Sequence, residues 1–309
     1  MRQPSIAGRR PVKKSSGIFA HSSWDVIPVL SGTIHLGFIV WLVATFSGRA
    51  LWMNLILGCV YSIAMSWTIN SVAHNFLHTP YFRWRPLNYA FSLVESLAIG
   101  VSQTFYTWIH LRHHRGNSDR PGPDGTTLDW LSIYRHGRNG EPEALWSYVF
   151  KSFFRNDIGD VYKAIRERRR RFDAEFGRFE IAAFICMVLG LLVVDPRAVL
   201  FLVPFYYFGE CLSSLNGYFE HFGGNPEKPI AWGVSTYAPI YNVTWFNNGY
   251  HAEHHYRPGI HWTRLPALHR EIAERQREEG VHTIRLAHAL GFIGYRRRTR
   301  VQQAPRSLA

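Results

Sequence analysis

The sequence predicts an all-α membrane protein: about four transmembrane helices in two hairpins, an interfacial helix, and a helical cap on one side of the membrane. Three observations carry this prediction. Long apolar runs come in pairs, and a short turn separates the members of each pair. Histidines gather in three short boxes, each near the end of an apolar run. Most charged residues lie in the polar segments on one side of these runs, as the positive-inside rule requires.

At 309 residues the chain is long enough for one domain or two. We divide it into an N-terminal tail over 1–25, a membrane domain over 26–285 and a basic C-terminal tail over 286–309. The first segment carries Arg9, Arg10, Lys13 and Lys14 and has no small-residue cleavage site, so it predicts a cytoplasmic tail and not a signal peptide. The net charge is +13, and the basic residues cluster beside apolar spans. This arrangement favours a membrane surface over nucleic acid as the partner.

The first hairpin is predicted from two apolar runs, 26–46 and 51–72. At 1.5 Å per residue, each is long enough to cross about 30 Å of hydrocarbon. The turn at 47–50 between them is short. The second run leads to the first box, in which His74 and His78 stand four residues apart and share a helix face. His35, inside the first run, is interpreted as a packing or water-contacting group.

The next apolar run, 87–108, leads directly to the second box, which contains His110, His113 and His114. If the first two boxes share one metal centre, this run cannot be a single crossing. We expect it to lie along the interface or to enter the membrane and return. Glu95 and Gln103 also make it a poor lipid-exposed span.

The second hairpin is predicted from the runs 179–194 and 198–215, with Asp195 and Pro196 in the turn between them. The hydrophilic segment 115–178 precedes it and includes the arginine-rich run 166–171, which assigns this side to the cytoplasm. That run is either a topology signal alone or a docking face for an acidic electron carrier or anionic lipid headgroups. The hairpin ends near His221, and the chain stays polar through the third box to the C-terminus.

The third box places three histidines at i, i+3 and i+4, a spacing that puts them on one helix face. One such box is more often a solvated helix face than a metal site, but three boxes in one chain favour metal binding. With no thiolates available, nine imidazoles suit two five- or six-coordinate ions better than one tetrahedral zinc, and two non-haem irons are the simplest assignment. The predicted ligands are His74, His78, His110, His113, His114, His221, His251, His254 and His255.

Carboxylates are expected beside such a site, because acidic partners orient metal-bound imidazoles. Glu220, Glu253 and Asp124 are candidates by position, and each could equally be a solvated acid. We expect His221 to point to the metal centre and Glu220 to point elsewhere, because adjacent helical residues diverge by about 100°. Alternatively, His221 is an interfacial histidine near a lipid headgroup.

The boxes HNFLH, HLRHH and HAEHH resemble those of the membrane fatty acid desaturase superfamily, which includes acyl desaturases, carotenoid ketolases and hydroxylases, and alkane monooxygenases. The resemblance extends over about 26–270. The segment 261–266 is similar to the Trp-x-x-Leu-Pro element of desaturases and ketolases, whereas 220–223 resembles the Glu-His-Tyr-Gly segment of alkane monooxygenases. Family members often place an asparagine four residues before the extra histidine. Here Asn216 precedes His221 by five, which rotates it away from that face.

This resemblance implies O2-dependent oxidation of an unactivated C–H bond at two iron ions, with a long hydrocarbon chain as substrate. Desaturation of an acyl lipid is the leading prediction. Hydroxylation or ketolation of an alkyl or carotenoid-like lipid is the alternative, because placement of the substrate carbon decides between them. The chain has neither paired cysteines nor a glycine-rich nucleotide fingerprint. A separate ferredoxin, rubredoxin or cytochrome is therefore expected to supply electrons.

Two other classes remain. A membrane metal transporter would carry its ligands at helix breaks in mid-membrane, and not at the helix ends. A membrane zinc hydrolase would need fewer histidines and an H-E-x-x-H motif, which this sequence lacks. Metal analysis separates the three classes.

Overall fold

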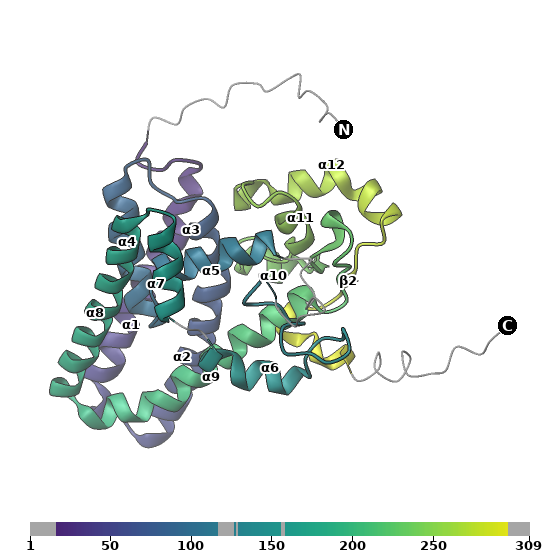
Figure 1. Ribbon diagram of the computed structural model, residues 1–309. Coiled ribbons are helices and arrows are strands. Elements are labelled where there is room, and N and C mark those ends of the chain that lie inside the picture. The colour runs from purple at the N-terminus through teal and green to yellow at the C-terminus, as the bar shows by residue number, and fades with distance from the viewer. Residues whose placement is uncertain (1–16, 117–126, 128, 156–157, 296–309) are drawn as a thin grey trace.

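The computed structural model describes residues 17–116, 127, 129–155 and 158–295. Their regular structure is almost entirely helical, with one pair of very short parallel strands (Figure 1). The α-helices are α1 Val26–Ala44, α2 Leu51–Trp67, α3 His74–His78, α4 Arg85–Ile99, α5 Gln103–Arg115, α6 Leu145–Lys151, α7 Ile158–Glu167, α8 Arg171–Val194, α9 Pro196–His221, α10 Pro239–Thr244, α11 His251–Tyr256 and α12 Leu265–Glu278. The strands are β1 Ser235–Thr236 and β2 Thr283–Ile284, and the shorter helical turns are η1 Ser23–Asp25, η2 Phe46–Gly48, η3 Thr68–Ala73, η4 Ser152–Arg155, η5 Pro229–Ala231, η6 Trp262–Arg264 and η7 His288–Leu290.

Four helical segments in the described part of the chain are long and apolar enough to cross a membrane: Ser23–Ala44, Leu51–His78, Arg171–Val194 and Pro196–His221. Their outer faces carry large exposed apolar side chains, among them Ile34, Val193 and Leu200. Val193 is 87% exposed, which would be unfavourable in water but is expected for a lipid-facing residue. The prediction of an all-α membrane protein with four spans is confirmed.

The two predicted hairpin turns lie together at one end of the bundle. Asp195 caps α9, because its carboxylate accepts hydrogen bonds from the backbone N–H groups of Arg197 and Ala198, and Pro196 occupies the first helical position. The hydroxyl of Ser47, in the other turn, donates to the same carboxylate. Between these turns and the cap, α2 and α9 pack closely enough that a Cβ at Gly209 would lie 2.7 Å from Cβ of Met65.

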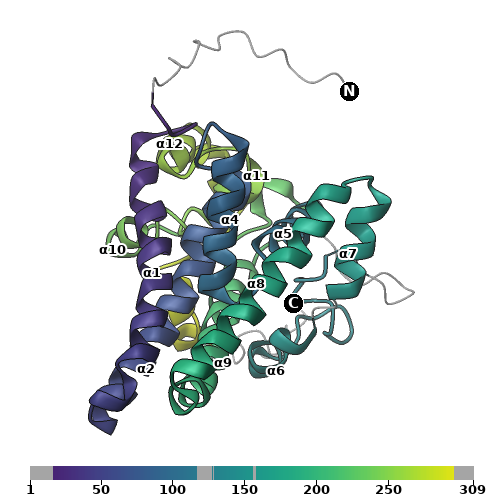
Figure 2. The same cartoon turned by 90° about the vertical axis from the view of Figure 1, so that its left-hand side faces the viewer.

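The run 87–108 forms two helices, with the break at Gly100. This glycine ends α4 in the left-handed region, at φ 73°, where a side chain would be strained. Figure 2 shows α4 beside α1 and α8, after which the chain turns and α5 leads toward α11 (Figure 1). The run is therefore two helices joined at Gly100 and not one continuous helix. Glu95 is fully buried against α1, and a Cβ at Gly32 would overlap its carboxylate.

The second span does not end as a regular α-helix. One π-helical turn, η3, joins α2 to α3, and all six of its residues are buried. Such turns are rare and often lie at functional sites. The wider turn changes which side of the helix the following residues occupy, so it sets the direction in which the first histidine box faces. Hydropathy gave no sign of it.

The folded unit is wider than the expected domain 26–285. Asp25 is fully buried and accepts hydrogen bonds from Nε2 of His261 and Nε1 of Trp262, both 2.9 Å away, which joins the start of α1 to the segment after the third box. At the other end, η7 packs against α9, and His288 is fully buried. Residues 17–25 and 286–295 thus belong to the packed structure. The rest of both predicted tails lies outside the described residues.

Candidate metal centre

The nine predicted histidines come from four helices that meet at the end of the bundle nearest the cap. Helix α3 supplies His74 and His78, and α9 supplies His221 at its last residue. The second and third boxes lie on α5 and α11 and supply His110, His113, His114, His251, His254 and His255. Histidines up to 181 positions apart in sequence therefore become neighbours.

The first histidine group, which we call group one, has five members: His74, His78, His110, His114 and His254. If one ring nitrogen is taken from each of these histidines, the five nitrogens all lie within 4.8 Å of one another. Nε2 of His110 is 2.9 Å from that of His114 and 3.1 Å from that of His74. Nε2 of His254 is 3.1 Å from Nε2 of both His78 and His114.

The second histidine group, group two, has three members, His113, His221 and His255, again with nitrogens within 4.8 Å of one another. Nε2 of His221 is 3.1 Å from that of His113 and 3.2 Å from that of His251, which stands at the edge of the group. The second and third boxes each contribute to both groups. The rings of one box therefore divide between the two groups, because the groups lie side by side and neighbouring helical positions can reach different ones.

The chemistry of these donors fits bound metal ions. A neutral imidazole carries one N–H, and where Nδ1–H donates outward, Nε2 presents a lone pair. Nδ1 of His74 is 3.2 Å from Oδ1 of Asn248, and Nδ1 of His113 is 2.8 Å from Asp129. The lone pairs on Nε2 therefore converge, which is unfavourable without a cation between them. Buried His255 has no hydrogen-bond partner on either ring nitrogen in the described structure.

Burial also keeps these rings neutral. It lowers the pKa of His110, His114, His251, His254 and His255 well below the usual range for histidine, and neighbouring imidazoles lower each pKa further. Neutral imidazole is the form that binds metals.

Two residues that hydrogen-bond to the outward-facing Nδ1 atoms of these rings were not predicted from the sequence. Asp129 lies in the segment between α5 and α6, and no spacing rule connects it to His113. Asn248 precedes the third box by three residues and links His74 to Glu220, since its Nδ2 donates to Oε1 of Glu220 at 2.7 Å. A polar residue just before a histidine box was visible in the sequence. Its contact with the first box depends on the fold alone.

Glu220 lies beside group two, so the expectation that it points elsewhere was wrong. Its carboxylate is 3.8 Å from Nδ1 of His251, and Oε1 also accepts a hydrogen bond of 2.7 Å from Nδ2 of Asn216. Asn216 is fully buried, and its Oδ1 accepts from the hydroxyl of Tyr241 at 3.2 Å. The five-residue offset from His221 places Asn216 four residues before Glu220, on the face of the carboxylate rather than that of the imidazole.

Glu253 faces away from the histidine groups. Although it is fully buried, its carboxylate accepts hydrogen bonds from Ser235, Tyr237 and Nδ1 of His269, at 2.7, 2.9 and 2.6 Å. Glu253 therefore fastens the third-box helix to β1 and α12, and it is neither beside the rings nor a solvated acid. The remaining candidate, Asp124, lies outside the described residues.

Comparisons with known proteins identify the family. A model of the fatty acid desaturase family matches residues 50–287. The chain belongs to this family. It is 25% identical over 296 residues to a sphingolipid delta(4)-desaturase of Candida albicans, an alignment that covers 88% of this chain and 77% of the relative. It is 30% identical over 239 residues to a sphingolipid delta(4)-desaturase DES1-like protein of Oryza sativa subsp. japonica, covering 75% of this chain and 63% of the relative. No solved structure matches.

Membership of the desaturase family makes this chain a membrane oxidoreductase of lipid metabolism, in a family whose catalysis depends on iron. Among the described residues, eight of the nine predicted histidines fall in groups that could hold a metal ion, and the ninth, His251, lies 3.2 Å from His221.

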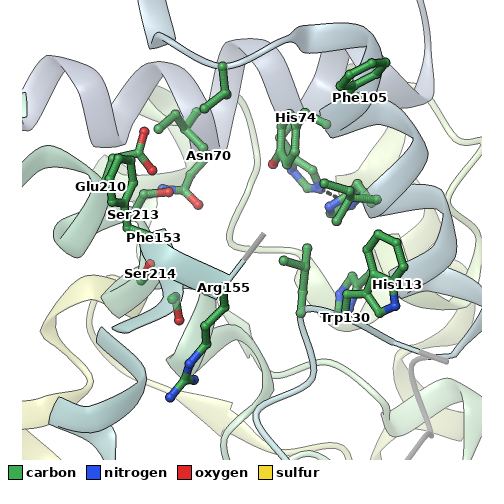
Figure 3. Close-up of a pocket in the computed structure, with 18 of the residues that line it drawn as sticks. Asn70, His74, Phe105, His113, Trp130, Phe153, Arg155, Glu210, Ser213 and Ser214 are labelled. Carbon is green, nitrogen blue, oxygen red and sulfur yellow. Dashed lines mark hydrogen bonds between the residues drawn. The ribbon is translucent and has the colours of Figure 1, made fainter. Parts of the chain in front are cut away.

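A cavity of about 390 Å³ adjoins both histidine groups, a volume within the usual range for ligand pockets. Figure 3 shows His74 and His113 on one side of it, with Asn70, Glu210 and Ser213 across the open space. Its walls are largely apolar; they include Ile69, Phe105, Tyr106, Ile109, Trp130, Phe153, Ile181, Phe184 and Tyr206.

Proposed function

We propose that this protein is an O2-dependent desaturase that introduces a double bond into the hydrocarbon chain of an acyl lipid, using two iron ions bound by the nine histidines. The observation that carries the proposal is the position of two adjacent all-histidine groups at the wall of an apolar cavity. Group one would hold one iron. Group two, with His251, would hold the other. When bound, the irons supply the reductive activation of O2 and the oxidation of the C–H bond.

The chain's own residues hold the rings and the substrate. Asp129 and Asn248 keep a proton on Nδ1 of His113 and His74, so that Nε2 of each ring faces inward. The apolar walls exclude water and align the chain with its reacting carbon beside the rings. Hydroxylation, monooxygenation or ketolation of an alkyl or carotenoid-like lipid is the alternative, because the same residues would serve either outcome. Both curated relatives are named as sphingolipid desaturases, which favours desaturation and a lipid substrate.

The mechanism requires electrons from outside the chain. We propose a separate ferredoxin, rubredoxin or cytochrome, reaching the histidine groups from the cytoplasmic side. The arginine-rich run before α8 supports this orientation through the positive-inside rule.

The reaction is tested by expressing the protein in a host and analysing its lipids by mass spectrometry, with metal content measured on the purified protein. A desaturase gives products lighter by two hydrogens and contains about two irons per chain, the number that two histidine groups would hold. Products heavier by one oxygen identify the hydroxylase alternative. Bound zinc without lipid turnover supports the hydrolase class, and reversible metal binding without turnover supports the transporter class.

The orientation is tested by labelling single cysteines. In a variant without the native Cys59, Cys186 and Cys211, cysteines replacing Gly48 and Arg197 should react with an impermeant reagent added outside the cell, because Gly48 lies in one hairpin turn and Arg197 directly follows the other, at the end of the bundle opposite the histidine groups. A cysteine replacing Arg168 should react only after permeabilisation. The reverse pattern would separate the metal groups from a cytoplasmic electron donor and would overturn the proposed orientation.

A further inference from the structure

One wall of the cavity is polar, although the space is shaped for a hydrocarbon chain. Asn70, Glu210 and Ser213 gather on this wall, across the cavity from His74 and His113 (Figure 3). Two helices supply them. Asn70 lies in the π-helical turn η3, and Glu210 and Ser213 lie on α9.

The polar wall is continuous with the helix face that delivers His221. Along α9 the cavity is lined by Glu210, Ser213, Ser214, Gly217, Glu220 and His221, a spacing typical of one helical stripe. Glu210 precedes His221 by three helical turns, about 16 Å along the axis at 1.5 Å per residue. The stripe thus runs from the histidine groups toward the membrane interior.

Asn70 and Ser213 are hydrogen-bonded to each other, whereas Glu210 has an oxygen without a hydrogen-bond partner in the described structure. Nδ2 of Asn70 donates to Oγ of Ser213 at 3.1 Å and to the carbonyl of Ser66 at 2.8 Å, which ties α9 to the second span. Within the described structure, Oε1 of Glu210 is enclosed and has no hydrogen-bond partner. Arg155 also lines the cavity, but its guanidinium donates to both carboxylate oxygens of Glu143, at 2.6 and 2.7 Å.

An unpartnered carboxyl is unfavourable in an apolar space, and a ligand that donates a hydrogen bond would remove that cost. A carboxyl accepts hydrogen bonds in either protonation state, whereas a methylene chain offers no donor. Glu220 and Glu253, by contrast, accept hydrogen bonds from side chains of the protein.

We infer that Glu210, supported by the Asn70–Ser213 pair, is a specificity-determining subsite that binds a hydroxyl on the substrate chain. The inference rests on the proposed function, and it names the substrate class as a long-chain lipid with a hydroxyl at a carbon other than the reacting one. The reacting carbon would lie beside the histidines, and the hydroxyl would lie at Glu210 across the cavity (Figure 3).

Two probes of equal length test the subsite without requiring turnover: hexadecane and 1-hexadecanol, at the same mole fraction in lipid nanodiscs that contain the iron-loaded protein. Binding is followed by the shift in thermal unfolding. We expect the alcohol to bind at least about tenfold more tightly, since a site built to hydrogen-bond a hydroxyl rejects the analogue that lacks it. Equal binding by the wild-type protein overturns the inference, whatever the variants do.

The variants assign the preference to Glu210. Glu210→Met keeps the side-chain length but removes both oxygens, so the preference for the alcohol should disappear. Glu210→Gln keeps one acceptor oxygen and should retain part of it. The control is Glu175→Gln on the exposed side of α8, which should behave as wild type. A preference unchanged in Glu210→Met contradicts the inference.

Turnover separates the two proposals. If host lipids are desaturated but the alcohol has no advantage in binding, the subsite is wrong and the proposed function stands. If the alcohol binds preferentially but no lipid is oxidised, the proposed function fails while the subsite stands. A fall in turnover of an unsubstituted chain in Glu210→Met, with no change in the binding preference, would show a role in the chemistry instead and would reject the subsite.

Discussion

The two histidine groups differ in how their surroundings compensate charge. Group one contains five imidazoles, and among the described residues no hydrogen bond or ion pair joins a carboxylate to them; the side chain that hydrogen-bonds to His74 is the amide of Asn248. Group two contains three imidazoles with His251 at its edge, and it has two acidic neighbours, Asp129 and Glu220. The group with fewer rings is therefore the one with negative charge nearby.

The largest effect is expected from two single variants, each of which removes one imidazole from one of the groups. His254→Ala leaves four imidazoles in group one, whereas His113→Ala leaves two in group two together with His251. Both should lose at least about 100-fold in turnover, because incomplete coordination leaves the iron weakly held. Iron analysis should show a deeper loss for His113→Ala.

The control for this pair is His35→Gln, which changes a buried histidine bonded to Thr68 and outside both groups. It should keep its iron and its activity. Full iron and full turnover in both ring variants would remove the metal assignment. Equal iron loss would keep the assignment but reject the difference between the groups.

A smaller effect is expected from the carboxylate that supports group two. Asp129→Asn keeps the size of the side chain but removes its charge, so Nδ1–H of His113 would be held less strongly. Loss of such a partner typically reduces metal affinity or activity by about 10- to 100-fold. Titration of Asp129→Asn with a chelator should release the more weakly held iron first. The control is Asp160→Asn, on the exposed surface of α7. Chelator resistance equal to wild type would mean that Asp129 does not tune the site.

The smallest effect is expected from the pair Asn216 and Glu220. Glu220→Gln should lower turnover by about tenfold or less, since the residue lies 3.8 Å from His251 and outside both groups of nitrogens. Asn216→Ala removes one donor to Glu220 and should be milder still. Because Asn216 acts through Glu220, the double variant should be no worse than Glu220→Gln alone. Additive losses would show that Asn216 contributes by another route.

The sequence predicted the membrane spans and the histidine pairs because both depend on local periodicity. Hydropathy over about 20 residues identifies a span, and the observed spans agree with the predicted runs, except that the last three extend further toward the histidine groups. The turn at Asp195 and Pro196 was equally local, since a cap and a proline act within one helical turn. The shared face of His74 and His78 follows from a four-residue spacing, and both rings do lie in group one.

The tertiary structure alone decided how the rings divide between two groups. Adjacent His254 and His255 enter different groups, because α11 meets α3 and α5 on one side and the end of α9 on the other. Asp129 and Asn248 became partners of rings 16 and 174 residues away. The π-helical turn before His74, and the position of Glu220 beside His251, likewise depend on how helices cross. Spacing along one helix gives the angle between side chains, but only the packing of several helices determines what each side chain meets.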